Sequence, residues 1–220
     1  MEKYKALFHA SIRFEFGKKV VYVDPYNISG NPKDADYIFI THPHYDHYSE
    51  ADIKRVEKRT TKFVMPKTMA LEAKYPKNKE KITFIVPKKK YQIDEIKFET
   101  IPAYNILRPF HLRVYGWVGY VFTDPETNER YYVMGDTDAT REASKVKANV
   151  VFIPVGGTYT MDVIEAANLI LKMKPDVVIP IHYGSIVGSS DKEGLKFRDL
   201  ILGQNISTKV EIEVWKGRNF

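Results

Sequence analysis

Seven consecutive residues, 41–47, hold the densest cluster of metal-binding side chains in this sequence. Three of the six histidines of the chain and one aspartate fall within it, namely His42, His44, His47 and Asp46. The apolar residues 37–40 come directly before the cluster and predict a buried strand. Pro43 excludes a regular helix, so the side chains must fan out from a loop at the end of that strand. Imidazole and carboxylate groups that converge from a rigid loop are the ligands of a transition-metal site.

Two further polar motifs follow predicted strands. Gly135–Asp138 comes after the apolar residues 131–134, and His182–Gly184 comes after residues 177–181. Side chains at strand ends are held by the sheet, which supplies the rigidity that a metal site needs. Taken alone, each motif has a plain interpretation, since a Gly-Asp-Thr-Asp sequence is usually a turn and a single histidine is most often a hydrogen-bonded core residue. We likewise interpret His9, in the first strand region, as a core or strand-edge histidine rather than a ligand.

The composition indicates a globular chain without disulfides. Of the 220 residues, 44% are hydrophobic and 28% are charged, and no apolar run approaches the roughly 20 residues of a membrane span. The chain has no cysteine, so any metal must be held by His, Asp, Glu or Asn. Residues 1–9 contain no signal-peptide core, and we expect a cytoplasmic location.

The net charge of +6 raises the question of an acidic partner. The lysines are spread along the chain, and we interpret the densest run, Lys88–Lys90, as a solvated loop. Nucleic acid is therefore not the expected partner; we expect a small-molecule substrate, with an anionic one as an option. The abundance of Lys and Glu resembles the composition of thermophile proteins.

Apolar periodicity predicts two groups of strands interspersed with helices. Two or three short strands are expected within residues 4–24, and others at 37–40, 63–65, 82–86, 96–101, 117–123, 130–134, 150–153, 177–181 and 210–214. Helices are expected after an N-cap at Ser49, through about Glu57, and at 67–73, 161–173 and 192–202. This order suggests two sheets packed together, with helices outside.

Residues 42–47 match the H-x-H-x-D-H signature of the metallo-β-lactamase-fold hydrolases, and the chain resembles that family from about Ala10 to Gly184. Its second half, including 154–161 and 180–183, resembles a small single-domain subgroup of metal-dependent hydrolases. That subgroup is related to the L-ascorbate-6-phosphate lactonase and N-acyl-phosphatidylethanolamine phospholipase D branches. The resemblance implies one domain over residues 1–220 with an α+β, four-layer αββα sandwich: two mixed sheets, helices outside, and a metal site at one edge between the sheets.

The resemblance also implies a dinuclear site, with zinc as the expected metal and manganese or iron as alternatives. The implied ligands are His42 and His44 for the first ion, Asp46, His47 and His182 for the second, and Asp136 as the bridge. Many relatives have a further histidine where this chain has Asn105. Either His111, six residues later, reaches in as the third ligand of the first ion, or Asn105 takes that place and the first ion is loose or absent. We favour His111, because an amide oxygen is a weaker ligand than imidazole.

Such a site is suited to hydrolysis. A divalent ion lowers the pKa of its bound water towards about 7, and the resulting hydroxide attacks a carbonyl carbon or a phosphorus atom. By resemblance, Asp46 would orient this hydroxide and accept its proton. We expect a metal-dependent hydrolase that uses metal-bound hydroxide on a small ester, lactone or phosphodiester. The alternatives are a nuclease or RNA-processing enzyme of the same superfamily, and a non-catalytic metal-binding protein with a degenerate first site.

Several other residues are candidates for supporting roles. Asp24, at the end of a predicted strand, would accept a ring N–H from a metal-binding histidine, although a simple turn aspartate is the alternative. Tyr159 and Tyr183 are candidate donors to a substrate or metal pocket. The backbone N–H groups of residues 156–160 would hold an anionic group, with a plain tight turn as the alternative.

Overall fold

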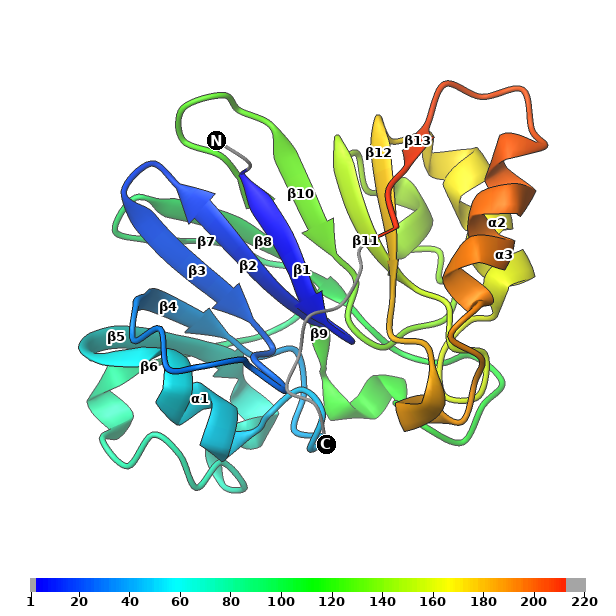
Figure 1. Cartoon of the computed structure of the whole chain (residues 1–220). Helices are drawn as coiled ribbons and strands as arrows, with labels where there is room; N and C mark the ends of the chain where they lie inside the picture. The colour runs from blue at the N-terminus through cyan, green and yellow to red at the C-terminus, as the bar shows by residue number, and fades with distance from the viewer. Residues whose placement is uncertain (1–2, 213–220) are drawn as a thin grey trace. The chain divides into compact units, whose positions relative to one another are not determined.

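A computed structural model describes residues 3–212 of the chain. These residues form two compact units, which we call the first unit, up to Val86, and the second unit, Pro87–Ile212. Each unit is built around one β-sheet, whose strands run parallel in one half and antiparallel in the other (Figure 1). The expectation of two mixed sheets is therefore confirmed. The single domain over residues 1–220 stays a prediction.

The six strands of the first unit lie in the order in which they follow along the chain. They are β1 (Tyr4–Phe8), β2 (Ser11–Phe16), β3 (Lys19–Val23), β4 (Ala35–Phe39), β5 (Glu57–Pro66) and β6 (Ile82–Ile85). Strands β1 to β3 pair antiparallel, whereas β3 to β6 pair parallel. The carboxyl ends of β3, β4 and β5 consequently meet at one edge of the sheet.

Helix α1 (Glu50–Val56) covers part of the first sheet. Ser49 caps it as predicted, accepting a hydrogen bond from the backbone N–H of Asp52 at 3.3 Å. Ile53 and Val56 are fully buried and belong to the same apolar cluster as residues of β4 and β5. Two short 3₁₀ turns, Lys67–Ala70 and Lys79–Lys81, complete the unit.

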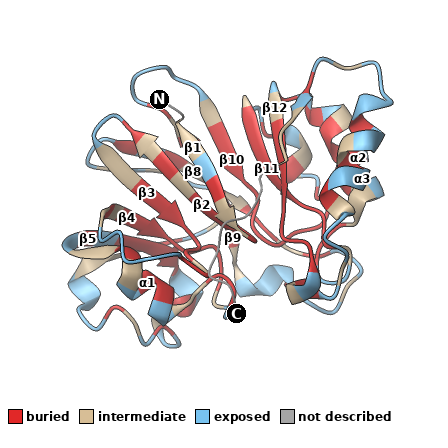
Figure 2. Cartoon of the chain, viewed as in Figure 1, coloured by how far each residue is buried: buried red, intermediate tan, exposed pale blue. Residues whose placement is uncertain are grey.

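The second unit contains seven strands in the order β13-β12-β11-β10-β9-β8-β7. They are β7 (Lys90–Ile93), β8 (Ile96–Pro102), β9 (Val118–Thr123), β10 (Arg130–Val133), β11 (Val150–Pro154), β12 (Val177–Ile181) and β13 (Lys209–Val210). Strands β10 to β13 run parallel, and β7 to β10 antiparallel. The strands are mostly buried while the connecting loops are exposed (Figure 2).

Two helices, α2 (Val163–Met173) and α3 (Glu193–Leu202), pack against each other in the second unit. Asp162 caps α2, and Glu165 returns a hydrogen bond to the Asp162 backbone, which forms a capping box. The apolar stripe predicted for this helix is confirmed as core packing, since Ala166, Ile170 and Met173 are buried. Short 3₁₀ turns lie at Arg113–Tyr115, Ala143–Lys145 and Ser185–Val187. Between residues 3 and 212, no helix has the length and apolarity needed to cross a bilayer.

The structure departs from the predicted elements in a few places. Lys90–Ile93 forms an edge strand, so the solvated loop expected at Lys88–Lys90 ends one residue earlier than predicted. The alternation of Tyr91 and Ile93 with polar residues was hidden by the lysine run, and Tyr91 stacks on Phe98 of the neighbouring strand at 5.4 Å. The helix predicted at 67–73 is only a 3₁₀ turn. Residues 213 and 214 of the last predicted strand lie outside the described residues.

Candidate metal centre

The loop of residues 41–47 leaves β4 at the edge where the parallel strands of the first unit end. The backbone N–H groups of His47 and Tyr48 both donate to the carbonyl of His44, at 3.0 and 2.8 Å, which closes the loop into a tight turn. The turn buries His42, Asp46 and His47 and leaves His44 exposed. The loop therefore presents the side chains of His42, His44, Asp46 and His47 just after the end of β4, as the sequence predicts.

Distances between donor atoms in the first unit match those expected around one ion. Two ligands of a tetrahedral zinc ion, each 2.0–2.1 Å from it, lie about 3.3 Å apart. His42 Nε2 is 3.1 Å from His44 Nδ1. Asp46 Oδ2 is 3.1 Å from His9 Nε2 and 3.6 Å from His47 Nε2. Since imidazole and carboxylate are also the donors that zinc, manganese and iron accept, these residues fit a divalent transition metal.

Asp24 contacts the ring of His47, which is the hydrogen bond expected of it; its supporting role at a metal site stays a prediction. Asp24 Oδ2 accepts hydrogen bonds from His47 Nδ1 at 2.8 Å and from the Thr41 hydroxyl at 2.6 Å, while Oδ1 accepts the Thr41 backbone N–H at 2.8 Å. Burial raises the pKa of the Asp24 carboxyl above its ordinary value, and the contacts with His47 and Thr41 act in the opposite direction. The bond to Nδ1 places the proton of His47 there and leaves Nε2 available as a ligand.

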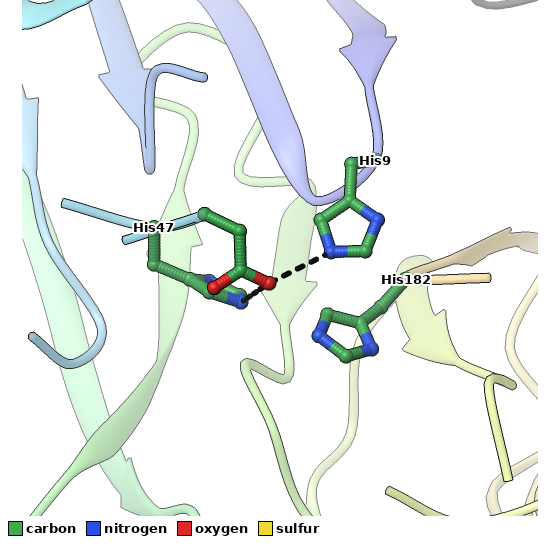
Figure 3. Close-up of side chains that lie close together, drawn as sticks. His9, His47 and His182 are labelled. Atoms are coloured by element: carbon green, nitrogen blue, oxygen red, sulfur yellow. Dashed lines mark hydrogen bonds and ion pairs between the residues drawn. The ribbon is translucent and has the colours of Figure 1, made fainter. Parts of the chain in front are cut away.

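His9 is the residue whose role the sequence did not suggest. It lies in the turn between β1 and β2 with a left-handed backbone, φ = 56°, and is buried. The expected core position is thus correct, yet its ring also reaches the carboxylate of Asp46. Figure 3 shows the His9 and His47 rings, and its dashed lines mark their contacts with that carboxylate. Its place at the end of the first predicted strand was visible in the sequence, but no local pattern indicates its contact with Asp46, 37 positions later.

The second unit brings together three of its predicted ligands. Asp136 follows β10 and His182 follows β12, at the edge where parallel β10, β11 and β12 end. Asp136 Oδ2 lies 2.9 Å from His182 Nε2 and 3.1 Å from His111 Nε2. All three side chains are buried. Both histidines have left-handed backbones, with φ of 52° at His111 and 54° at His182. The ring of His182 is labelled in Figure 3.

Asn105 supports the loop that carries His111. Its backbone N–H donates to the His111 carbonyl at 2.9 Å, and its Nδ2 donates to the Tyr159 carbonyl at 2.7 Å. Nδ2 also lies 3.4 Å from His111 Nδ1. His111 thus contacts Asp136 directly, while the hydrogen bonds of Asn105 go to the His111 loop and to Tyr159. This is the arrangement that the His111 alternative requires; the choice of ligand stays a prediction.

The remaining candidates have contacts of their own. The Tyr183 ring is buried against α3, where a Cβ at Gly194 would lie 2.5 Å from the Tyr183 hydroxyl oxygen. Burial, with Asp191 nearby, raises the pKa of Tyr183 to about 12. In the 156–160 loop, the Gly157 N–H donates to the Met161 carbonyl at 3.2 Å. A Cβ at Gly156 would lie 2.5 Å from the His182 carbonyl oxygen, so this glycine allows the close packing that positions His182.

Comparisons with known proteins place this chain in one family. Residues 5–182 match the family described as "Beta-lactamase superfamily domain". A UPF0173 metal-dependent hydrolase of Pyrococcus furiosus is 30% identical over 200 residues, covering 84% of this chain and 86% of the relative.

Solved structures share the fold. The structure of a candidate metal-dependent hydrolase from Parabacteroides distasonis is 27% identical with a TM-score of 0.78, covering 96% of this chain and 91% of that one. Igni18, a metallo hydrolase from the hyperthermophilic archaeon Ignicoccus hospitalis, has the same TM-score of 0.78 at 19% identity, with coverage of 98% and 95%. The relatives from Pyrococcus furiosus and Ignicoccus hospitalis are thermophile proteins, which agrees with the thermophile-like composition of this chain.

Proposed function

Since this chain belongs to the β-lactamase superfamily domain family and is a metal-dependent hydrolase with the metallo-β-lactamase fold, we propose that its two sets of donors form one dinuclear centre. We propose further that this centre hydrolyses a small ester, lactone or phosphodiester. The observation that carries the proposal is the spacing of the donor atoms. In each unit, imidazole and carboxylate donor atoms lie at the separations expected between neighbouring ligands of an ion.

The number of donors is sufficient for two ions. The two sets together supply eight donor residues, which gives each ion four or five protein ligands if one carboxylate is shared. The family match at residues 5–182 contains both sets, which supports one domain over residues 1–220 and one centre within it.

The donor residues can be divided between the two ions. We propose that His42 and His44 with His111 hold the first ion, that His9, Asp46 and His47 with His182 hold the second, and that Asp136 bridges them. When bound, the ions supply an acidic water and a Lewis acid for the reacting oxygen. Asp46 accepts the proton of the attacking water, and its contacts with His9 and His47 fix the orientation of its carboxylate. Asp24 keeps the proton of His47 on Nδ1.

Zinc is the proposed metal, because imidazole and carboxylate are its usual protein ligands, with manganese and iron as alternatives. We propose a small-molecule substrate and a cytoplasmic location, the latter in keeping with a chain that has no cysteine. Both proposals come from composition rather than from the geometry of the site.

The test combines metal analysis with a substrate panel. Protein purified without added metal is analysed for bound zinc, manganese and iron, then assayed with esters, lactones, phosphodiesters and RNA. We expect up to two ions per chain and turnover of one ester-type class. Asp136→Asn and His47→Ala should lose metal and turnover while keeping the wild-type circular dichroism spectrum. The exposed Asp199 on α3 provides the control Asp199→Asn, which should keep both.

Other outcomes would select the alternatives. Turnover of RNA alone would identify the nuclease. One ion or none, with no turnover of any substrate, would identify a non-catalytic protein with a degenerate first site. Full activity in Asp136→Asn or His47→Ala would remove both residues from the centre.

A further inference from the structure

The loop between β8 and β9 exposes an unusual amount of apolar surface. Six of the ten residues 106–115 are apolar and substantially exposed: Ile106 at 59%, Leu107 at 92%, Phe110 at 41%, Leu112 at 40%, Val114 at 81% and Tyr115 at 42%. We call these six side chains the apolar patch. Scattered exposed apolar residues are ordinary, whereas six of them within ten residues of one loop indicate a candidate binding surface.

Polar contacts hold this loop in place. The guanidinium of Arg108 forms ion pairs with Asp138 and Glu165. The backbone N–H of Ile106 donates to Asp138 Oδ2 at 2.8 Å. These polar contacts fix the backbone of the loop, so its apolar side chains stay exposed to solvent.

The apolar patch is continuous with the metal-binding residues of the second unit. His111 lies within the same ten residues, and its Nε2 is 3.1 Å from Asp136 Oδ2. The preceding residue, Phe110, packs edge-on against the half-exposed ring of Tyr159, with centroids 4.9 Å apart. On its other side, His111 lies 5.5 Å from the ring of Trp117. A candidate metal ligand is therefore flanked by aromatic and aliphatic side chains.

The charges of the loop are already neutralised. Both ion-pair partners of Arg108 are carboxylates, and Arg113 pairs with Glu142 at 2.7 Å. Burial acts to raise the pKa of Glu142, but hydrogen bonds from Lys88 and Tyr104 and the charge of Arg113 hold it at about 2, so this carboxylate is ionised. The loop consequently presents apolar surface, and no uncompensated arginine, to a substrate.

We propose that the apolar patch binds an acyl or aromatic group of the substrate, next to the bond that is hydrolysed. This inference rests on the proposed function and narrows it to esters or lactones with an apolar substituent, in place of a small anionic substrate. Leu107, Phe110 and Tyr159 are the specificity-determining residues. Each CH₂ covered by the patch should raise kcat/KM roughly three- to fourfold, the ratio that corresponds to about 0.8 kcal/mol.

The test is a series of p-nitrophenyl esters from acetate to octanoate with the metal-loaded protein. We expect kcat/KM to rise along the series in the wild type. In Leu107→Ser and Phe110→Ser, the ratio of octanoate to acetate should fall at least tenfold. Leu71, 99% exposed in the first unit, gives the matched control Leu71→Ser, which should keep the wild-type ratio. A ratio that is the same in all four proteins would overturn the inference.

Failure of the proposed function would be distinguishable. If no ester, lactone or phosphodiester is turned over, that function fails, and calorimetric titration with octanoate and with acetate then tests the apolar patch alone. Tighter binding of octanoate that Leu107→Ser abolishes supports the inference; equal binding of the two acids overturns it. Analytical ultracentrifugation tests whether the apolar patch instead binds a second copy of the chain. A dimer that Leu107→Ser dissociates, together with an unchanged ratio of octanoate to acetate turnover, would also overturn the inference.

Discussion

Replacing Asp24 by asparagine isolates the contribution of a residue that is not proposed to touch the metal. In the native site, both carboxylate oxygens only accept hydrogen bonds, from His47 Nδ1 and from the hydroxyl and backbone N–H of Thr41. Asparagine has one oxygen and one NH₂ group in the same volume. If its oxygen keeps the Thr41 backbone N–H, its NH₂ group faces Nδ1 of His47, where two donors would oppose each other.

His47 can resolve that conflict by moving its proton from Nδ1 to Nε2. Nε2 is the nitrogen that lies 3.6 Å from Asp46 Oδ2 and that we propose as a ligand. The substitution therefore favours the tautomer that cannot bind metal. Loss of such supporting hydrogen bonds typically lowers metal affinity 10- to 100-fold, which corresponds to about 1.4–2.7 kcal/mol. The substitution loses hydrogen-bond energy but also removes the desolvation penalty of a buried carboxylate. The free energy of unfolding of the metal-free protein should therefore change by only about 1 kcal/mol.

The assay is competition for zinc against a chelator of known affinity, with thermal unfolding of the metal-free protein measured in parallel. Asp199→Asn makes the same chemical change at an exposed position and should leave zinc affinity unaltered. Wild-type zinc affinity in Asp24→Asn would refute the tautomer argument. A large loss of metal-free stability with unchanged affinity would show instead that Asp24 only holds the loop together.

Three further predictions follow from named contacts. His111→Ala should remove about one equivalent of metal by elemental analysis, whereas Asn105→Ala should change metal content little; the opposite pattern would make Asn105 the ligand. His9→Phe should weaken zinc binding about tenfold by chelator competition, because it removes one donor 3.1 Å from Asp46; unchanged binding would return His9 to a purely structural role. Glu142→Gln should lower the free energy of unfolding by about 1–2 kcal/mol at pH 7, discounted for solvent screening. Because the folded pKa of about 2 is below the ordinary value of 4.5, this difference should be constant above about pH 5 and vanish as the pH falls towards 2; a difference independent of pH in denaturant titrations would contradict it.

Much of the fold was predictable because the relevant signals are local. The buried strand before residues 41–47, the cap at Ser49 and the apolar stripe of α2 all follow from patterns within a few positions. Asp24 was also a reasonable prediction, since it directly follows a predicted strand that precedes the 41–47 loop. The structure then supplies the reason, because β3 and β4 are parallel neighbours whose ends lie together.

The less predictable features depend on contacts between distant residues. His9 reaches Asp46 across 37 positions, and only the turn between β1 and β2 directs its ring there. The relation of His111 to Asn105 depends on a loop whose course is fixed by Arg108 and its two carboxylate partners. No periodicity in the sequence encodes such ion pairs. The edge strand β7 was hidden for a different reason, because its lysines resemble solvent-facing loop residues.

The left-handed backbones of His9, His111 and His182 have a consequence for how the protein could be altered. A residue with a side chain is disfavoured there by roughly 1–2 kcal/mol, and glycine is not. All three imidazoles are also buried, so glycine would relieve the backbone strain but leave a cavity, which typically costs about 2–5 kcal/mol. The packing of each ring therefore outweighs the strain of the backbone that carries it, and the histidines are kept in place by the core around them as well as by any ion.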